Sequence, residues 1–180
     1  MKFGQMSLPK LSPKADYLQL DICGRNTEEA IARYENYKTD IPVVLHGDWT
    51  KKGASENNIG SRLDEYVDII LKLKEKTSVL GFTMHPPFRK KVSFEEFTAY
   101  CEEIEERTGV EVWIENRSNS RIWLSTPEEI IAFSKKHTMT IDIAQLYISC
   151  GYSNDVLIET LLQIDWTLVR EMHLSNVKRT

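Results

Sequence analysis

The chain has 180 residues, of which 41% are hydrophobic and 28% are charged, and its net charge is −4. This composition is typical of one globular domain, here residues 1–180, that is long enough to bury a sizeable core. The negative charge argues against a globally basic nucleic-acid binder. No run approaches the roughly 18 consecutive apolar residues of a membrane span, and the first residues lack the apolar core of a signal peptide. We therefore expect a cytoplasmic protein with no membrane partner.

The three cysteines, Cys23, Cys101 and Cys150, are odd in number and widely spaced. This pattern argues against a disulfide framework and against a cysteine-rich zinc site. We interpret them as small buried hydrophobic residues.

In the first half of the chain, short apolar runs alternate with stretches of helical periodicity. Thr27 is placed to cap a helix, and a polar loop over residues 47–58 separates a buried strand from the helix after it. The expected elements are strands at 3–6 and 17–22, a helix at 28–37, a strand at 42–46 and a helix at 62–74.

The second half repeats the alternation with clearer helix signals. Ser93 and Glu96 form an S-x-x-E capping box, Gly109 closes that helix, and Thr126 with Pro127 opens the next one. The expected elements are strands at 79–85, 110–115, 139–143 and 169–174, and helices at 94–108, 127–136 and 154–162, the last opened by Ser153.

Buried strands that alternate with amphipathic helices indicate an α/β fold, either an open doubly wound sheet or a (β/α)8 TIM barrel. Five successive strands end on a residue that can bind a metal. Only in a barrel do all strands open onto one mouth, so convergence of these residues favours the barrel. The sequence also lacks a G-x-G-x-x-G phosphate loop, which an open dinucleotide-binding sheet would usually show. The five strand-end residues are His46, His85, Glu115, Asp142 and His173.

The sequence contains seven expected strands and stops soon after the seventh. We expect a barrel that is incomplete at the C-terminus, either truncated or naturally open, with its eighth unit missing. An open edge would expose unpaired strand groups, which makes a homo-oligomer plausible.

Glu115, Asp142 and His173 form the strongest set among the strand-end residues. Two carboxylates and an imidazole suit one divalent ion of Mn, Zn, Co or Fe, whereas Mg is less suited once a histidine is bound. The alternative is that each acidic residue only caps a helix or forms an ion pair in a loop.

Five short motifs resemble those of the xylose isomerase-like TIM barrels, which include sugar and sugar-phosphate isomerases and epimerases and the type IV AP endonucleases. The resemblance implies that Glu115, Asp142 and His173 bind metal, that Glu115 also acts as a catalytic base, and that a further glutamate ligand lies beyond Thr180. The motifs are His46-Gly47, His85-Pro86, Ile114-Glu115-Asn116, Asp142-Ile143-Ala144-Gln145 and His173-Leu174-Ser175-Asn176.

The chain departs from the family pattern at Gln145, where a histidine is usual, and at Asn176, where an aspartate is common. A glutamine cannot replace an imidazole in a zinc cluster at similar affinity, so a three-metal endonuclease site is disfavoured and a single-metal site is favoured. The same resemblance makes Gln145 a substrate contact. We expect His46 and His85 at the rim to bind substrate as well; the alternatives are that each is a hydrogen-bonded structural histidine or that they belong to a larger metal cluster.

Basic residues collect in the loops that follow the strands. These loops hold nine of the 23 lysines and arginines, including Lys51, Arg89 and Arg117, while acidic residues crowd the helices. A positive mouth on a negative protein steers anions toward the metal, although charged loop residues can also be merely solvated. We expect a small anionic sugar-like substrate bound in part by these three residues.

Taken together, the resemblance implies a divalent-metal-dependent isomerase or epimerase that transfers a proton through an enediolate. Two alternatives remain open. One is an AP endonuclease-like hydrolase that binds DNA, and the other is a non-catalytic or truncated metal-binding barrel.

Overall fold

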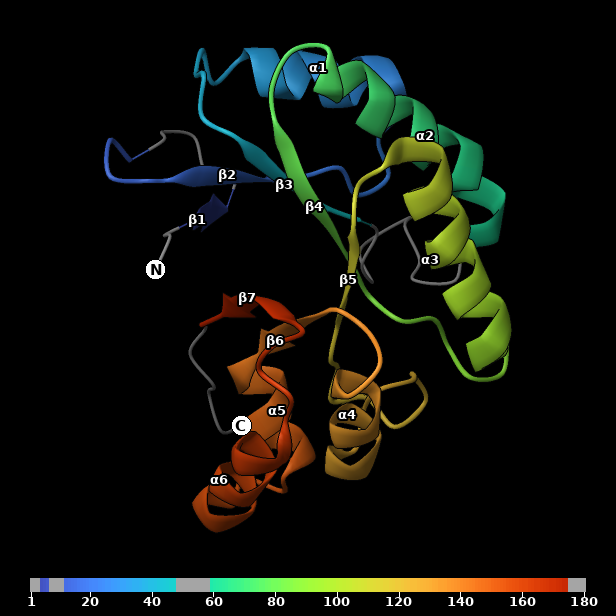
Figure 1. Ribbon diagram of the computed structural model, residues 1–180, viewed down its shortest axis with the longest axis vertical. Coiled ribbons are helices and arrows are strands. Elements are labelled where there is room, and N and C mark those ends of the chain that lie inside the picture. Colours follow the sequence, from blue (N-terminus) through green and yellow to red (C-terminus); the bar gives the residue numbers. More distant parts are fainter. Residues whose placement is uncertain (1–3, 7–11, 48–58, 175–180) are drawn as a thin grey trace. The chain divides into compact units, whose positions relative to one another are not determined.

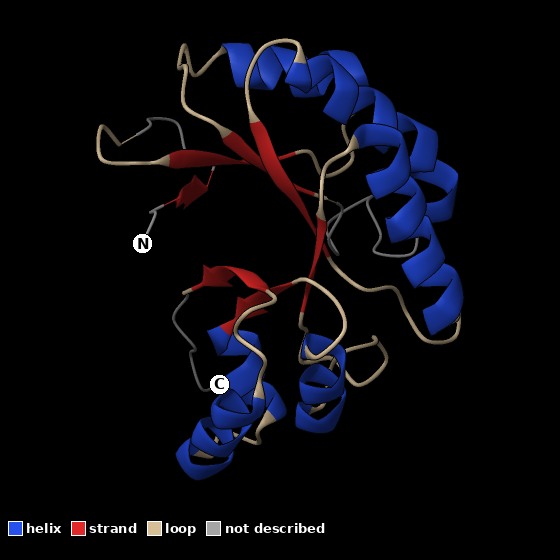
Figure 2. Ribbon diagram, in the orientation of Figure 1, coloured by secondary structure: helices blue, strands red, loops and turns tan. Residues whose placement is uncertain are grey.

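The computed structural model describes residues 4–6, 12–47 and 59–174. The chain divides into two compact units, the first made of Met1–Met84 and Thr98–Val112 and the second of His85–Phe97 and Trp113–Thr180. In both units, strands alternate with helices along the chain (Figures 1 and 2). The predicted α/β class is therefore confirmed, while the prediction of a single domain over residues 1–180 stays a prediction.

The first unit is a parallel sheet whose strands pair in chain order, with helices packed beside it (Figure 1). Its strands are β1 (Gly4–Met6), β2 (Tyr17–Asp21), β3 (Val43–His46) and β4 (Val79–Met84), and its helices are α1 (Thr27–Glu35), α2 (Ile59–Lys74) and most of α3 (Phe94–Thr108).

Apolar side chains fill the core of the first unit. Leu18 and Leu20 of β2 and Leu45 of β3 are fully buried, and Tyr66 of α2 packs against Phe82 of β4 with ring centroids 5.2 Å apart. Because both faces of β3 are covered, its four residues are all buried, as expected for a strand inside a parallel sheet.

The second unit is also built on parallel strands, with β6 between β5 and β7 (Figure 2). No helix among the described residues is long and apolar enough to cross a membrane. The strands are most of β5 (Val112–Glu115), β6 (Met139–Asp142) and β7 (Val169–His173), and the helices are α4 (Pro127–Ser134), α5 (Ile143–Ser149) and α6 (Asn154–Gln163).

Several predicted helix ends are confirmed. The hydroxyls of Ser93, Thr126 and Ser153 accept hydrogen bonds from the backbone amides three residues onward, and Gly109 ends α3 with φ +65°. That left-handed conformation carries little steric cost for glycine, which explains why α3 stops there.

The predicted cap of the first helix is wrong by one residue. Asn26 is the N-cap, because its side chain accepts from the amide of Glu29 at 2.9 Å and the Glu29 carboxylate accepts from the amide of Asn26 at 3.1 Å. Thr27 is instead the first helical residue, and its hydroxyl donates to Asp68 at 2.7 Å. Asparagine and threonine both cap helices, so sequence alone did not decide between these neighbours.

Helix α5 was not predicted. The strand expected at 139–143 ends at Asp142, and the chain turns at once into a seven-residue helix. Its first residue, Ile143, is β-branched and fits a continuation of the strand. As a result, Asp142 is both the last residue of β6 and the N-cap of α5, which matters for the chemistry described next.

Candidate metal centre

The register of β5, β6 and β7 places polar side chains side by side at their carboxyl ends. Glu115 pairs with Thr140, and Thr140 pairs with Glu171, so these three residues form one row across the strands. Asp142 and His173 form the next pair, two residues further along. Residues two apart on a strand share a face, so both rows lie on the same face of the second unit.

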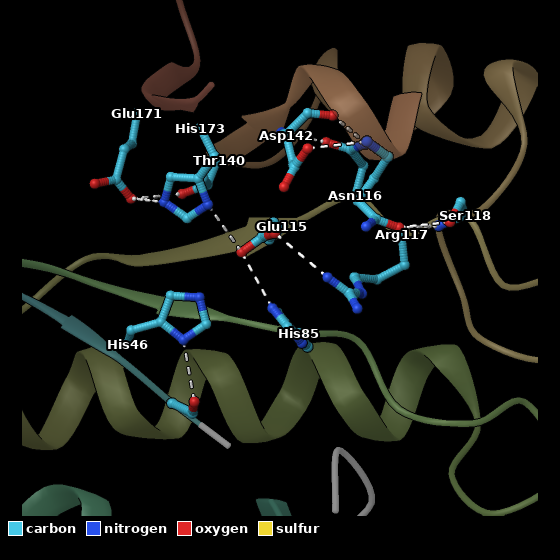
Figure 3. Close-up of polar contacts among 12 residues, drawn as sticks. His46, His85, Glu115, Asn116, Arg117, Ser118, Thr140, Asp142, Glu171 and His173 are labelled. Carbon is cyan, nitrogen blue, oxygen red and sulfur yellow. Dashed lines mark hydrogen bonds and ion pairs between the residues drawn. The ribbon is translucent and has the colours of Figure 1, made fainter. Parts of the chain in front are cut away.

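Glu115, Asp142 and His173, here called the acid–histidine cluster, bring their side chains together (Figure 3). One ligand atom from each lies within 4.8 Å of those of the other two. Nδ1 of His173 is 3.3 Å from Oε2 of Glu115. Zinc ligands on bonds of about 2.1 Å lie ~3.0–3.4 Å apart, so this pair already has the spacing of two ligands on one ion.

Asp142 is held from two sides. Its Oδ1 accepts from the amide of Gln145 at 2.9 Å, which caps α5 and leaves the carboxylate a second oxygen. Its backbone amide donates to Oδ1 of Asn116 at 2.8 Å, and its carbonyl accepts from the Asn116 side chain at 3.1 Å. Burial raises the pKa of Asp142, and the nearby Glu115 carboxylate adds to that rise.

Both ring nitrogens of His173 face carboxylates. Nδ1 faces Glu115, and Nε2 is 3.1 Å from Oε2 of Glu171. Burial alone would lower the pKa of His173, but the hydrogen bonds to Glu115 and Glu171 outweigh it and raise the pKa to about 10. Without a metal, the imidazole is therefore a cation at neutral pH.

Glu115 is the most heavily engaged of these side chains, and only 2% of its side chain is exposed. Besides His173, its Oε2 meets Nε2 of His85 at 3.2 Å, and its Oε1 meets Nη1 of Arg117 at 3.6 Å. The second unit thus brings the predicted residues His85 and Arg117 to the acid–histidine cluster.

The backbone amide of Gln145 binds Asp142 of the cluster, whereas its side chain binds the loop after β5. Its Oε1 accepts hydrogen bonds from the backbone amide of Ser118 at 3.2 Å and from the Ser118 hydroxyl. The amide oxygen is thus committed to the loop after β5, which fixes the position of this loop next to the first turn of α5.

Arg89 contacts residues other than those of the acid–histidine cluster. It donates to Glu129 at 2.6 Å, stacks on the ring of Trp123 at 4.4 Å and reaches Ser125 at 3.2 Å. Burial alone would raise the pKa of Glu129, but Arg89 and backbone amides lower it. These contacts assign Arg89 to packing the loops against α4 rather than to the acid–histidine cluster.

Two predicted site residues do not belong to the described part of the second unit. His46, at the end of β3, belongs to the first unit, where its buried ring meets the carbonyl of Gly47 at 3.2 Å. Lys51 lies outside the described residues.

Sequence reasoning missed Glu171 and Thr140. Both are buried, and Oγ1 of Thr140 lies 3.4 Å from Oε2 of Glu171. The signal was present for Glu171, because a residue two positions before His173 on a strand faces the same side. For Thr140 it was weaker, since a threonine in a strand usually reflects β propensity.

Comparisons with protein families and with curated proteins find no match to this chain. Solved structures do resemble it. Dihydrodipicolinate synthase DapA-2 from Bacillus anthracis is 14% identical with a TM-score of 0.54, over 94% of this chain and 63% of the synthase. A monomeric dihydrodipicolinate synthase variant is 13% identical with a TM-score of 0.44, over 91% of this chain and 61% of the variant. The chain spans less than two thirds of either structure.

The likeness to the Bacillus anthracis synthase shows the fold, which is an α/β fold of the TIM-barrel type. The predicted fold class is thereby confirmed, whereas the likeness does not show membership of the xylose isomerase-like barrels. It also overturns the predicted function. The Bacillus anthracis structure is a synthase and not a metal-dependent isomerase, epimerase or endonuclease. The error arose because short motifs at strand ends report the position of a site more reliably than its reaction.

Proposed function

We propose that the second unit binds one divalent transition-metal ion through the acid–histidine cluster of Glu115, Asp142 and His173, and that this ion holds a small anionic sugar-like ligand. The observation that carries the proposal is the approach of three ligand atoms, from the ends of three neighbouring strands, to within 4.8 Å of one another. Two carboxylate oxygens and one imidazole nitrogen form a donor set for Mn, Zn, Co or Fe.

The burial of these groups supports a cation. Glu115, Asp142 and Glu171 are 2%, 8% and 6% exposed, so three carboxylates crowd a region with little water. Buried carboxylates are costly unless they are paired or coordinate a metal. A divalent ion would offset this cost and, once bound, would supply a Lewis acid that polarises ligand oxygens.

Arg117 supports an anionic ligand. Its guanidinium lies 3.6 Å from Glu115, and its side chain is 22% exposed, so Arg117 contacts the cluster and is also open to solvent. A planar guanidinium binds carboxylate or phosphate groups in a bidentate manner. His85, which also contacts Glu115, is placed to help hold the same ligand.

The proposal also includes a family relationship and a cellular location. A relationship to the xylose isomerase-like barrels is supported by the order of the strand-end motifs, with Glu115 and His173 in matching places. A cytoplasmic location is supported by the odd number and wide spacing of the three cysteines, Cys23, Cys101 and Cys150, which argue against a disulfide framework.

The test is a titration of the chelator-stripped full chain with Zn²⁺, Mn²⁺ and Co²⁺, with bound metal measured by elemental analysis. We expect one equivalent in the wild type. Glu115→Gln and Asp142→Asn should each weaken binding by more than the ~10–100-fold typical of changes around the ligands. Asp142→Asn is the cleaner variant, because asparagine can still cap α5.

The matched control is Glu159→Gln, which removes one negative charge from an exposed position on α6. It should bind metal as the wild type does. A wild-type chain that binds no metal, or ligand variants that bind it equally well, would refute the proposal. Arg117→Gln should retain the metal but lose affinity for inorganic phosphate, the probe for the anion.

A further inference from the structure

Glu171 occupies a buried position beside His173 that the proposed metal site leaves without a role. Its side chain is 3% exposed, and its Oε2 lies 3.1 Å from Nε2 of His173 and 3.4 Å from Oγ1 of Thr140. A buried carboxylate that accepts from an imidazole N–H and a hydroxyl has a fixed position and a fixed direction.

The two nitrogens of His173 are thereby distinguished. Nδ1 points toward Glu115 of the acid–histidine cluster, at 3.3 Å, and Nε2 points toward Glu171. A neutral imidazole carries one N–H and one lone pair, and the partner of the N–H decides which nitrogen offers the lone pair. An ionised carboxylate accepts a hydrogen bond but cannot donate one, so Glu115 and Glu171 each favour a proton on the nitrogen that they face. With Glu115 engaged as a ligand of the proposed ion, Glu171 is the acceptor that remains, and the single proton of the neutral ring would lie on Nε2.

Resting on the proposed metal site, we infer that Glu171 is a positioning residue that holds the proton of His173 on Nε2 and so makes Nδ1 the nitrogen that binds the metal. A metal ion on Nδ1 would replace the proton there, which would pass to solvent, and would leave the Nε2–H···Glu171 hydrogen bond in place. The ring need not turn, because Nδ1 already faces Glu115.

The position of Glu171 in the sheet supports this role. It pairs in register with Thr140, and His173 pairs with Asp142, so the strand pair β6–β7 sets both the ligand and its partner. Because Thr140 reaches the same carboxylate oxygen, the hydroxyl orients Glu171 toward the ring. A carboxylate–histidine–metal arrangement fixes ring orientation and raises the basicity of the ligand.

The experiment is long-range ¹⁵N NMR of the histidine rings in the Zn²⁺-loaded full chain, combined with zinc affinities from competition with a chromophoric chelator. In the wild type we expect zinc on Nδ1 of His173 and a slowly exchanging proton on Nε2. Glu171→Ala should lower zinc affinity ~10–100-fold and lose the protected Nε2 proton. Glu171→Gln, which keeps an acceptor oxygen, should retain zinc on Nδ1 with a smaller loss.

The outcomes separate this inference from the proposed function. Zinc bound through Nε2, or an unchanged affinity and Nε2 proton in Glu171→Ala, would overturn the role of Glu171 while the metal site stands. A wild type that binds no zinc would overturn both. Should Glu171→Ala fail to fold, Glu171→Gln decides alone, through the Nε2 proton and the affinity. Glu159→Gln should match the wild type in both measurements.

Discussion

The parallel strands of the two units bury different kinds of side chain. In the first unit, β2 and β3 bury Leu18, Leu20 and Leu45 without exposure. In the second unit, β5 and β7 bury Glu115 and Glu171. Burial of a leucine stabilises a fold directly, whereas burial of a carboxylate costs free energy that its partners must offset. Among the described residues, the buried acids are Glu115, Asp142 and Glu171, all in the second unit, which is the unit of the proposed metal site.

The largest expected change in stability comes from removing an apolar side chain of the first unit. Phe82→Ala should lower the free energy of unfolding by about 3–5 kcal/mol, because Phe82 is fully buried against Tyr66. Its zinc affinity, measured on the folded chain, should equal that of the wild type. Urea unfolding and a zinc titration check both quantities. A fall in zinc affinity would show that the apolar core of the first unit also serves the metal site.

The next effect arises in the second unit, from the metal itself. Zinc at a concentration of about 100 times its Kd should raise the free energy of unfolding by about 2.7 kcal/mol. Asp142→Asn should lose this gain while the metal-free chain keeps the cap of α5, because asparagine accepts the same hydrogen bond from Gln145. Thermal or urea unfolding with and without zinc makes the measurement. An equal gain in the variant would contradict Asp142 as a ligand.

The pH dependence of the metal-free chain tests the charge on His173. Its pKa is about 10 in the folded chain, against an ordinary histidine value of 6.5. Because the folded pKa is raised, the stabilisation is fully present below pH 6.5 and is lost as the pH rises through about 10. We expect the free energy of unfolding to fall over this range, because the deprotonated imidazole no longer makes charged hydrogen bonds to Glu115 and Glu171. His173→Gln should lack this component when urea unfolding is compared at the two ends of this range. An identical pH dependence in the variant would show that His173 does not carry the charge.

The smallest effects should not distinguish the units. Asn26→Ala at the start of α1 and Ser153→Ala at the start of α6 should each cost about 1 kcal/mol of unfolding free energy, because each removes one hydrogen bond to a helix amide. Neither should alter zinc affinity. Chemical unfolding of both variants side by side checks this. A much larger loss at Ser153 would mean that the second unit depends on its helix ends more than the first does.

The alternation of strands and helices was predictable, because apolar periodicity and capping residues act over a few positions. Ser93, Thr126 and Ser153 cap their helices as expected, and Gly109 ends α3. Helix α5 was not predictable in the same way, since seven residues carry too little periodicity to be recognised and Ile143 continues the apolar pattern of β6.

Local sequence also indicated that Glu115, Asp142 and His173 would meet, because parallel strands present their carboxyl ends at the same edge of a sheet. Only tertiary contacts decided which further side chains join these three and which predicted site residue binds other groups instead. The register between β6 and β7 brings Glu171 and Thr140 to His173, and Glu129 and Trp123 engage Arg89. These partners lie up to 40 residues apart in the chain, so their meeting depends on packing and strand register, which no short stretch of sequence encodes.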